Sequence, residues 1–399
     1  MKKTRIVFLT AMAVLLCLCG IFSFSRENAL PTSNGKDTQA EQEGFSLQKA
    51  RYLLGLCTKI NYPRKLETAL LSKEFSDYEY FEHKQNMGYK SGIAFSVANK
   101  KTESDTEIIL IFRGSTGAEW YSNFHMGEGE THAGFSAATD YAYAEFSEYL
   151  EEHGIKFDNT KITLTGHSRG GAVANLLSKR LIDSGNFESV SAYTFACPNT
   201  TKSTEVNAPR YKCIYNIENC EDFITRVPLE AWDYSKFGLR LRLPDLDDEN
   251  YSELYAQMEK NFEKIAGYPH ISYENRSRDI EAFLKDAESI APTVEELYSR
   301  KITTPQGSLT LGEYLENASA ILSKEFPLPE GMFILASSEC AELYPLTDFM
   351  LEGIDLTDLD EGIKLENSAV NSAHTLETYM AWLRVLEEEF FISRISEVT

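Results

Sequence analysis

The chain contains the stretch Gly166-His167-Ser168-Arg169-Gly170, which has the pattern G-x-S-x-G. The residues before it, 161–165 (Lys-Ile-Thr-Leu-Thr), predict a strand, whereas residues 171–177 (Gly-Ala-Val-Ala-Asn-Leu-Leu) predict a helix. A strand, a tight turn around a serine and a helix together form a nucleophile elbow, in which the serine hydroxyl stands clear of the sheet. Glycines on both sides of the serine permit the sharp reversal of the chain. This stretch therefore predicts an α/β fold and makes Ser168 the candidate nucleophile.

Strands and helices alternate on both sides of this elbow. Apolar and β-branched runs predict strands at residues 93–98, 107–112, 191–196 and 212–217, and helical spacing predicts helices at residues 45–60 and 135–154. The polar stretch 99–106 between the first two strands indicates a hairpin. The remaining alternation is typical of a mostly parallel sheet that is covered by helices on both faces.

The character of the chain changes after about residue 232. A short predicted strand at 239–243 is followed by residues 251–265 and 311–322, which carry apolar side chains at helical spacing. We interpret residues 232–328 as a helical insertion, either a packed lobe or a cap over the substrate. Beyond it, residues 355–366 predict an acidic loop and residues 373–390 predict one closing helix.

Charge and cysteine content exclude several classes of function. The chain has 61 Asp and Glu against 39 Lys and Arg, a net charge of −22, which would repel nucleic acids and anionic membrane surfaces. The cysteines beyond the N-terminal segment are scattered without C-x-x-C spacing, so we expect free thiols rather than a disulfide framework or a zinc site. We expect no metal and no organic cofactor.

The N-terminus has the pattern of an export signal. Residues 1–5 are basic, residues 6–24 are almost entirely apolar, and Ser23 and Ser25 supply small residues for cleavage. We predict a signal peptide over residues 1–25, or an uncleaved membrane anchor through residues 6–24, because ~20 apolar residues span a bilayer. A lipidated cysteine at 17 or 19 is disfavoured, since leucine precedes each. Polar residues 26–44 then predict a flexible linker, and residues 45–399 the folded, exported domain.

A serine nucleophile needs a base and an acid. In parallel-sheet hydrolases these follow the serine in the order acid then histidine, which leaves His270 and His374 as candidate bases. His374 directly precedes the closing helix, whereas His270 lies inside the predicted insertion, so we prefer His374 and keep His270 as the alternative. Either could instead be a surface-loop histidine. His167 is excluded because its side chain would diverge from that of Ser168.

For the acid, Asp222 is the best candidate because it follows the strand that ends near residue 217. Glu218 and Glu221 are its competitors. The negative charge that develops on an ester carbonyl needs at least two hydrogen-bond donors. The backbone N–H of Arg169 follows the nucleophile directly, and Ser115, in the loop after the strand that ends at residue 112, offers an N–H and a hydroxyl.

These motifs together resemble the class 3 lipases, the α/β-hydrolase family of fungal triacylglycerol lipases and their bacterial relatives. The resemblance extends over about residues 90 to 230 and the region of His374, and it rests on residues 112–115, 132–135, 166–171, 193–198 and Asp222 ahead of residues 227–228. It implies an α/β-hydrolase fold, a Ser168–Asp222–His374 triad, and an oxyanion hole formed by Ser115 and Arg169.

The chain departs from the family pattern at several points. Ala196 stands where the family usually has glycine, and Arg169 stands where it often has leucine. The interval of 152 residues between Asp222 and His374 is unusually long, and the fungal lid helix between Ser115 and His132 looks reduced.

The sequence therefore predicts an exported serine hydrolase that cleaves carboxylic esters, most readily lipid esters, through an acyl-serine intermediate. Its expected partner is a small-molecule or lipid ester substrate and not a nucleic acid, with the possible membrane anchor at residues 6–24 as given above. The alternative is a catalytically silent lipase-like protein that binds or adheres to a partner through its helical insertion.

Overall fold

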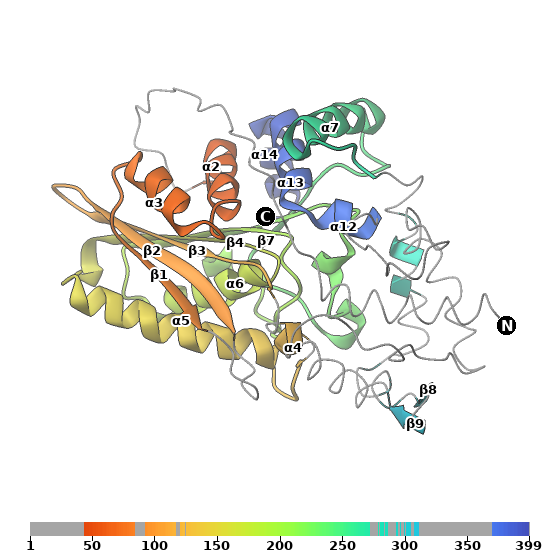
Figure 1. The fold of residues 1–399 in the computed structure, drawn as a ribbon, viewed down its shortest axis with the longest axis horizontal. Coiled ribbons are helices and arrows are strands. Elements are labelled where there is room, and N and C mark those ends of the chain that lie inside the picture. The colour runs from red at the N-terminus through yellow and green to blue at the C-terminus, as the bar shows by residue number, and fades with distance from the viewer. Residues whose placement is uncertain are drawn as a thin grey trace.

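The computed structural model describes residues 44–83, 92–116, 120–123, 125–271 and 369–398, with short pieces between residues 278 and 310. A seven-stranded sheet runs through the molecule, and helices lie on both of its faces (Figure 1). Its strands are β1 (Ser76–His83), β2 (Ile93–Lys101), β3 (Thr106–Phe112), β4 (Thr160–His167), β5 (Ser189–Phe195), β6 (Ile214–Glu218) and β7 (Leu239–Arg242).

The strands lie in the sheet in the order in which they occur in the chain. β1, β2 and β3 pair antiparallel, whereas β3 to β7 are all parallel. The predicted hairpin is confirmed, and its turn is shorter than predicted because Lys101 already pairs with Thr106. The mostly parallel sheet confirms the predicted α/β-hydrolase fold. Because β3 to β6 are parallel, the loops that follow them emerge at one edge of the sheet.

Alternation along the strands builds two apolar layers. Ile108 and Leu110 of β3 point into one core with α5 (Ala133–Glu152) and α6 (Arg169–Ser184). Ile109 and Ile111 point into the opposite core, which contains residues of α2 (Leu47–Cys57), α7 (Tyr251–Ala266) and α13 (Leu376–Val385). The sheet is therefore buried on both faces, as a parallel sheet requires.

The predicted helix at residues 251–265 is confirmed as α7. It packs on α13, and its Met258, Phe262 and Ala266 belong to the core over the sheet. Residues 301–304 and 307–310 form a small hairpin of β8 (Lys301–Thr304) and β9 (Gly307–Thr310). The predicted signal segment, the linker up to residue 43, the helix at 311–322 and the acidic loop at 355–366 lie outside the described residues.

The prediction of one closing helix over residues 373–390 is wrong. The structure has three helices there: α12 (Ala369–His374), α13 and α14 (Glu388–Val398). Thr375 is extended, with φ −67° and ψ 151°, and its hydroxyl accepts a hydrogen bond from the N–H of Thr378 at 3.4 Å. This N-cap ends α12 and starts α13, so His374 lies at a helix end beside the sheet. Leu386 is extended in the same way at the end of α13.

The shorter elements connect these layers. α3 (Pro63–Leu71) lies between α2 and β1, and α4 (Trp120–Asn123) precedes α5. Among the described residues, single turns of helix occur at η2 (Phe157–Asn159), η3 (Pro209–Tyr211), η4 (Phe223–Arg226) and η5 (Glu230–Trp232). Across the described residues, no helix combines the length and the apolar character that crossing a bilayer requires. Of the cysteines described, Cys57, Cys197, Cys213 and Cys220 are free thiols.

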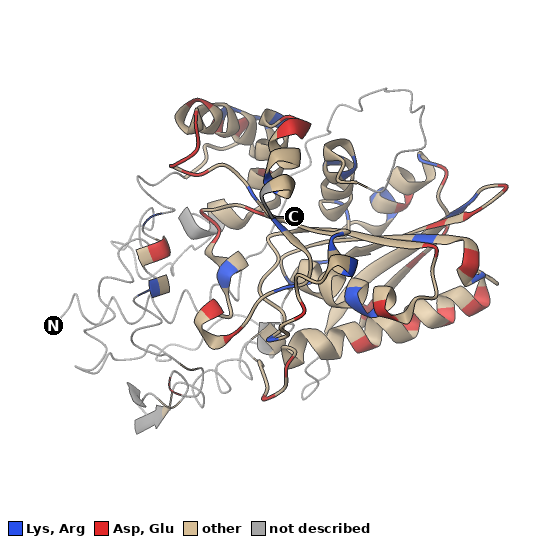
Figure 2. Cartoon of the chain, turned by 180° about the vertical axis from the view of Figure 1, so that it is seen from behind, with Lys and Arg blue, Asp and Glu red and all other residues tan. Residues whose placement is uncertain are grey.

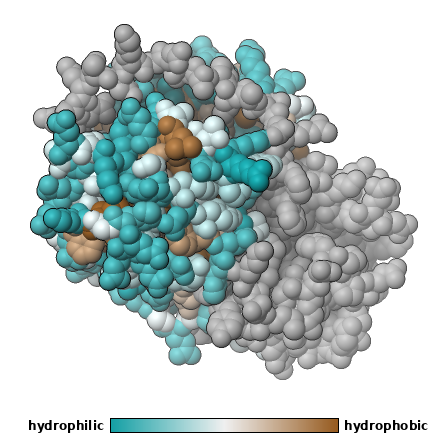
Figure 3. Space-filling view, turned by 60° about the vertical axis from the view of Figure 1, so that its left-hand side comes forward, coloured by the Kyte–Doolittle hydropathy of each residue, from teal (hydrophilic) through white to brown (hydrophobic). Residues whose placement is uncertain are grey.

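Charged side chains gather on the outside of the helices. Figure 2 shows acidic residues along the outer side of α5, a helix that contains no Lys or Arg. On the face drawn in Figure 3, the described surface is mostly hydrophilic, with apolar residues in small groups. The net negative charge is therefore carried largely by solvated surfaces in the described part of the chain.

Two glycines of the elbow occupy positions where no side chain fits. A Cβ on Gly166 would lie 2.3 Å from the carbonyl oxygen of Gly170, and a Cβ on Gly170 would lie 2.4 Å from that of Phe112. The first turn of α6 therefore rests directly on the ends of β3 and β4. Ser168 between them has φ +56°, in the left-handed region.

Substitution of Gly170 tests this close approach. Gly170→Ala should lower the free energy of unfolding by about 1–3 kcal/mol or more, because an added Cβ meets backbone that cannot move aside. The matched control is Gly55→Ala in the middle of α2, where the nearest atom is 3.9 Å away, at the end of a lysine side chain. That variant should gain about 0.5–1 kcal/mol. Urea unfolding followed by circular dichroism measures both, and equal effects would contradict this account.

Candidate active site

Ser168 lies at the turn between β4 and α6. Its main chain is held by a hydrogen bond from its own N–H to the carbonyl of Phe195 at 2.9 Å, and its carbonyl accepts from the N–H of Ala172 at the start of the helix. The side chain is largely buried, with 8% of the residue exposed. This geometry is the elbow that the sequence predicts, with the hydroxyl at the carboxyl edge of the sheet.

Two residues from distant parts of the chain meet this hydroxyl in series. The Oγ of Ser168 lies 2.9 Å from Nε2 of His374, and Nδ1 of His374 lies 2.8 Å from Oδ2 of Asp222. Both distances are within hydrogen-bond reach. A neutral imidazole with its hydrogen on Nδ1 donates to the carboxylate and accepts from the serine hydroxyl. The arrangement can take a proton from Ser168 and stabilise the imidazolium that results.

The carboxylate of Asp222 is fixed by further donors. Its Oδ1 accepts from the N–H of Ile224 at 3.1 Å, and its Oδ2 accepts from the hydroxyl of Tyr379 at 2.8 Å. Burial and the adjacent Asp222 hold the pKa of Tyr379 well above its usual value, so this hydroxyl keeps its hydrogen. The side-chain amide of Asn219 donates to the carbonyl of Ala373, which ties the acid loop to α12. Sequence reasoning missed Tyr379 and Asn219, and only the place of Tyr379 five residues beyond His374 could have suggested its role.

The other acidic candidates have different partners. Glu221 accepts hydrogen bonds from the hydroxyls of Tyr251 at 2.9 Å and Tyr255 at 3.3 Å. Glu218 is paired with Lys236 and Arg240. Both carboxylates are therefore engaged away from His374.

The two other histidines singled out by the sequence are also buried. His167 directs its Nε2–H to the carbonyl of His374 at 2.7 Å, and burial together with the nearby His374 lowers the pKa of its ring to about 3. It acts as a neutral donor beside the catalytic candidate, diverging from Ser168 as expected. His270 packs with its ring centroid 4.8 Å from that of Phe262 in α7. Neither His270 nor His374 is a surface-loop histidine, since each is less than a tenth exposed.

The candidate oxyanion hole lies between the loop after β3 and the start of α6. A Cβ on Gly114 would lie 3.8 Å from the Cβ of Ser168, so the loop of Gly114 and Ser115 lies alongside the elbow. Arg169 is the first residue of α6, where backbone N–H groups have no partner within the helix. The Oγ of Ser115 accepts a hydrogen bond from Nδ2 of Asn123 at 2.8 Å. The loop that carries Ser115 therefore lies next to the turn of Ser168, which leads into α6 at Arg169.

One of the departures from the family pattern has a visible structural basis. Ala196 has φ +53°, a backbone conformation that favours glycine. The glycine usual at this position in the family thus fits the same backbone. Among the described residues, no group of three or more His, Cys, Asp and Glu side chains is arranged to hold a metal ion.

Comparison with known proteins gives a family match. Residues 97–232 match the family model described as lipase (class 3). This segment contains Ser115, Ser168 and Asp222 and ends before His374. No curated protein sequence matches the chain.

Several solved structures are similar to the chain. The lipase from Rhizopus microsporus var. chinensis has 15% identity over 51% of this chain and 75% of its own, with a TM-score of 0.37. The triacylglyceride lipase of Rhizomucor miehei has 16% identity over 50% of this chain and 80% of its own, with a TM-score of 0.37.

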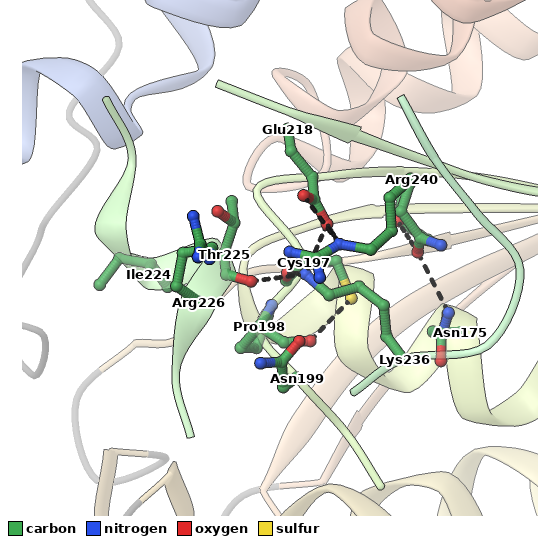
Figure 4. Close-up of polar contacts among 12 residues, drawn as sticks. Asn175, Cys197, Pro198, Asn199, Glu218, Ile224, Thr225, Arg226, Lys236 and Arg240 are labelled. Carbon is green, nitrogen blue, oxygen red and sulfur yellow. Dashed lines mark hydrogen bonds and ion pairs between the residues drawn. The ribbon is translucent and has the colours of Figure 1, made fainter. Parts of the chain in front are cut away.

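A buried ion pair lies next to the loop after β6, which carries Asp222. Nζ of Lys236 lies 2.8 Å from Oε1 of Glu218, and Nε of Arg240 lies 3.0 Å from the same oxygen. Lys236 also donates to the carbonyls of Cys197, in the loop after β5, and Thr225, in the loop after β6 (Figure 4). Its side chain is completely buried, and that of Glu218 nearly so. Lys236 therefore joins the two loops that flank the elbow and the acid.

The carboxylate of Glu218 remains charged in this pair. Burial alone would raise the pKa of Glu218, but the charges of Lys236 and Arg240 outweigh burial and lower it to about 2. A carboxyl with a lower pKa in the folded than in the unfolded chain stabilises the fold above its unfolded value, about pH 4.3. That stabilisation is lost as the pH falls from there toward the folded value.

Removal of one partner tests the pair. Glu218→Gln should lower the free energy of unfolding at neutral pH by about 3–5 kcal/mol, because it leaves a buried ammonium without its carboxylate. The difference from the wild type should shrink at about pH 3, where Glu218 of the unfolded wild-type chain is protonated. The matched control is Asp140→Asn, which breaks the exposed ion pair with Arg180 and should cost at most about 1 kcal/mol. Urea unfolding at the two pH values measures both variants, and a loss in Glu218→Gln no larger than in the control would refute this role.

Proposed function

We propose that this chain, whose residues 97–232 match the class 3 lipase family model, is a serine hydrolase that cleaves lipid esters through an acyl-serine intermediate. The observation that carries the proposal is the series of hydrogen bonds from the Oγ of Ser168 to His374 and from His374 to Asp222. The family match supports lipid ester hydrolysis, and this series offers a nucleophile, a base and an acid for the reaction.

In the proposed acylation step, Oγ of Ser168 attacks the ester carbonyl carbon while Nε2 of His374 takes the hydroxyl proton. Asp222 holds the Nδ1 hydrogen of His374 and stabilises the imidazolium. The carbonyl oxygen becomes an oxyanion that accepts hydrogen bonds from the backbone N–H of Arg169 and from Ser115. Collapse of this intermediate breaks the bond to the alcohol oxygen, which leaves with the proton from His374.

Deacylation repeats these steps with water. His374 takes a proton from the water, whose oxygen attacks the acyl carbon of the ester on Ser168. The second oxyanion is held by the same donors, and its collapse returns the proton to Oγ of Ser168 and releases the carboxylic acid. The neutral ring of His167 lies beside His374 and adds no second charge when the imidazolium forms. No step needs a group beyond the side chains and backbone of this chain.

We also propose that the protein is exported. The support is the sequence of the N-terminus, in which basic residues 1–5 precede the apolar stretch 6–24. Whether cleaved or kept as an anchor, such a segment would deliver the hydrolase domain to the outside of the cytoplasmic membrane.

Labelling of the nucleophile tests the proposed function. A fluorophosphonate should modify the wild type at Ser168, and the protein should hydrolyse members of a series of p-nitrophenyl esters from acetate to palmitate. Ser168→Ala should abolish the labelling and lower turnover by at least about 10⁴-fold. The matched control is Ser178→Ala, a buried serine of the same helix that donates only to the carbonyl of Ala174. A wild type that is neither labelled nor active on any of these esters would refute the proposal and favour a catalytically silent binding protein.

The two candidate bases can be compared directly. His374→Ala should lower kcat by about 10⁴-fold or more, because the serine then has no acceptor for its proton. His270→Ala should keep activity per folded molecule, because its ring packs against α7 rather than Ser168. Steady-state kinetics, with the folded fraction checked by circular dichroism, separates these results. Full activity in His374→Ala together with a loss in His270→Ala would assign the base to His270.

A further inference from the structure

The side chain of Arg169 is buried beside the candidate oxyanion hole. Only 1% of the residue is exposed. Its Nε and Nη2 donate to the carbonyl of Gly92 at 3.1 and 2.9 Å, and its Nη1 donates to Oδ1 of Asn123 at 2.8 Å. Nη2 also reaches the carbonyl of Gly134 at 3.4 Å, at the start of α5. The guanidinium thus connects the beginning of β2, the end of α4 and the first turn of α5.

This contact determines which way the amide of Asn123 points. A guanidinium has hydrogen-bond donors and no acceptor. The oxygen of the Asn123 amide must therefore face Arg169, and its NH₂ group faces the Oγ of Ser115, 2.8 Å away. The hydroxyl oxygen of Ser115 accepts this bond, so its own hydrogen is directed elsewhere. With the amide turned over, Oδ1 of Asn123 would accept that hydrogen instead and compete with an oxyanion for it.

The main chain around Asn123 is also held by contacts other than hydrogen bonds of the guanidinium. Its carbonyl oxygen lies 3.1 Å from Nε2 of His132, whose Nδ1 accepts from the N–H of Phe135. Burial and the charge of Arg169 lower the pKa of His132 to about 3, so the ring is neutral and carries its hydrogen on Nε2. A Cβ on Gly134 would lie only 1.8 Å from the carbonyl oxygen of Ser122. Because these contacts hold the backbone, the additional effect of the Arg169 guanidinium is to orient the Asn123 amide.

We propose that Arg169 is a positioning residue of the oxyanion hole, whose side chain orients the Asn123 amide and thereby keeps the hydroxyl hydrogen of Ser115 available to the oxyanion. One residue then serves the hole twice, because its backbone N–H donates directly and its side chain sets the direction of a second donor. The inference rests on the proposed function, since it concerns the transition state of ester hydrolysis.

Kinetics of Arg169→Met test the inference. Methionine keeps the backbone N–H and much of the side-chain volume but removes the guanidinium. Because loss of a whole oxyanion donor costs ~10²–10³ in rate, misdirection of Ser115 should lower kcat by about 10- to 100-fold. KM should change by less than about twofold, since the interaction forms in the transition state. Arg169→Lys, which keeps a donor of the same charge, should recover part of the loss. Rates are expressed per active site, counted by the end point of fluorophosphonate labelling.

A double-mutant cycle separates positioning from a direct effect of charge. Asn123→Ala should itself lower kcat, and adding Arg169→Met to it should lower kcat by no more than about a further twofold if Arg169 acts through Asn123. The matched structural control is Asn175→Ala, a buried amide of α6 that bonds Asn216 and the carbonyl of Phe237. It should lower stability and leave kcat per active site unchanged.

Two outcomes would overturn the inference while the proposed function stands. One is wild-type kcat in Arg169→Met. The other is an undiminished effect of that substitution in the Asn123→Ala background, which would mean that the charge acts on the oxyanion directly. If instead the wild type itself neither hydrolyses esters nor reacts at Ser168, the proposed function fails, and the inference fails with it.

Discussion

The contact between the first turn of α6 and the ends of β3 and β4 is the constraint on which the site depends. It is made by backbone atoms, because no side chain fits at Gly166 or Gly170. Between these glycines Ser168 adopts a φ of +56°, and the loop that carries Ser115 lies alongside this turn. Since β3 to β6 are parallel, the loops that bear the oxyanion donors and the acid come to the same edge of the sheet. The base reaches this edge from the far end of the chain.

Two buried cations hold these loops in place from opposite sides. Lys236 joins the loops after β5 and β6, and Arg169 joins the start of β2, α4 and α5. Loops packed this tightly bury carbonyl oxygens that the strands and helices cannot satisfy, and each unsatisfied oxygen would cost free energy. A lysine or arginine side chain satisfies several of them at once. The charge of Lys236 is balanced by Glu218, so that the acid Asp222 keeps its own separate set of neutral donors.

Local patterns in the sequence predicted the elbow, the hairpin of β2 and β3, and the helix α7, because each depends on the spacing of nearby residues. Those patterns failed at residues 373–390, where the cap made by Thr375 ends one helix and begins the next. They also left the choice of base between His270 and His374 open, because the order of residues along the chain does not show which of the two loops returns to the sheet. The role of Asn123 could not be found from the sequence, and that of Tyr379 only from its place close after His374, because both roles arise from contacts between elements and not from a motif. A buried lysine such as Lys236 gives no signal either, since most lysines in a sequence are exposed.

Arg169 and the helix α4, which lies between Ser115 and His132 in the chain, meet in one contact. The described part of that segment is held at the backbone of Asn123 by His132 and at its side chain by Arg169. An aliphatic residue at 169 could not hold the Asn123 amide, and a segment that moved away from α5 would leave a buried guanidinium short of an acceptor. The arginine at 169 and this position of the segment therefore stabilise each other, because a buried cation is tolerated only where its hydrogen bonds are made. The sequence pattern gives Arg169 a role only through its backbone N–H. Its side chain thus also holds the segment around Asn123, next to Ser115.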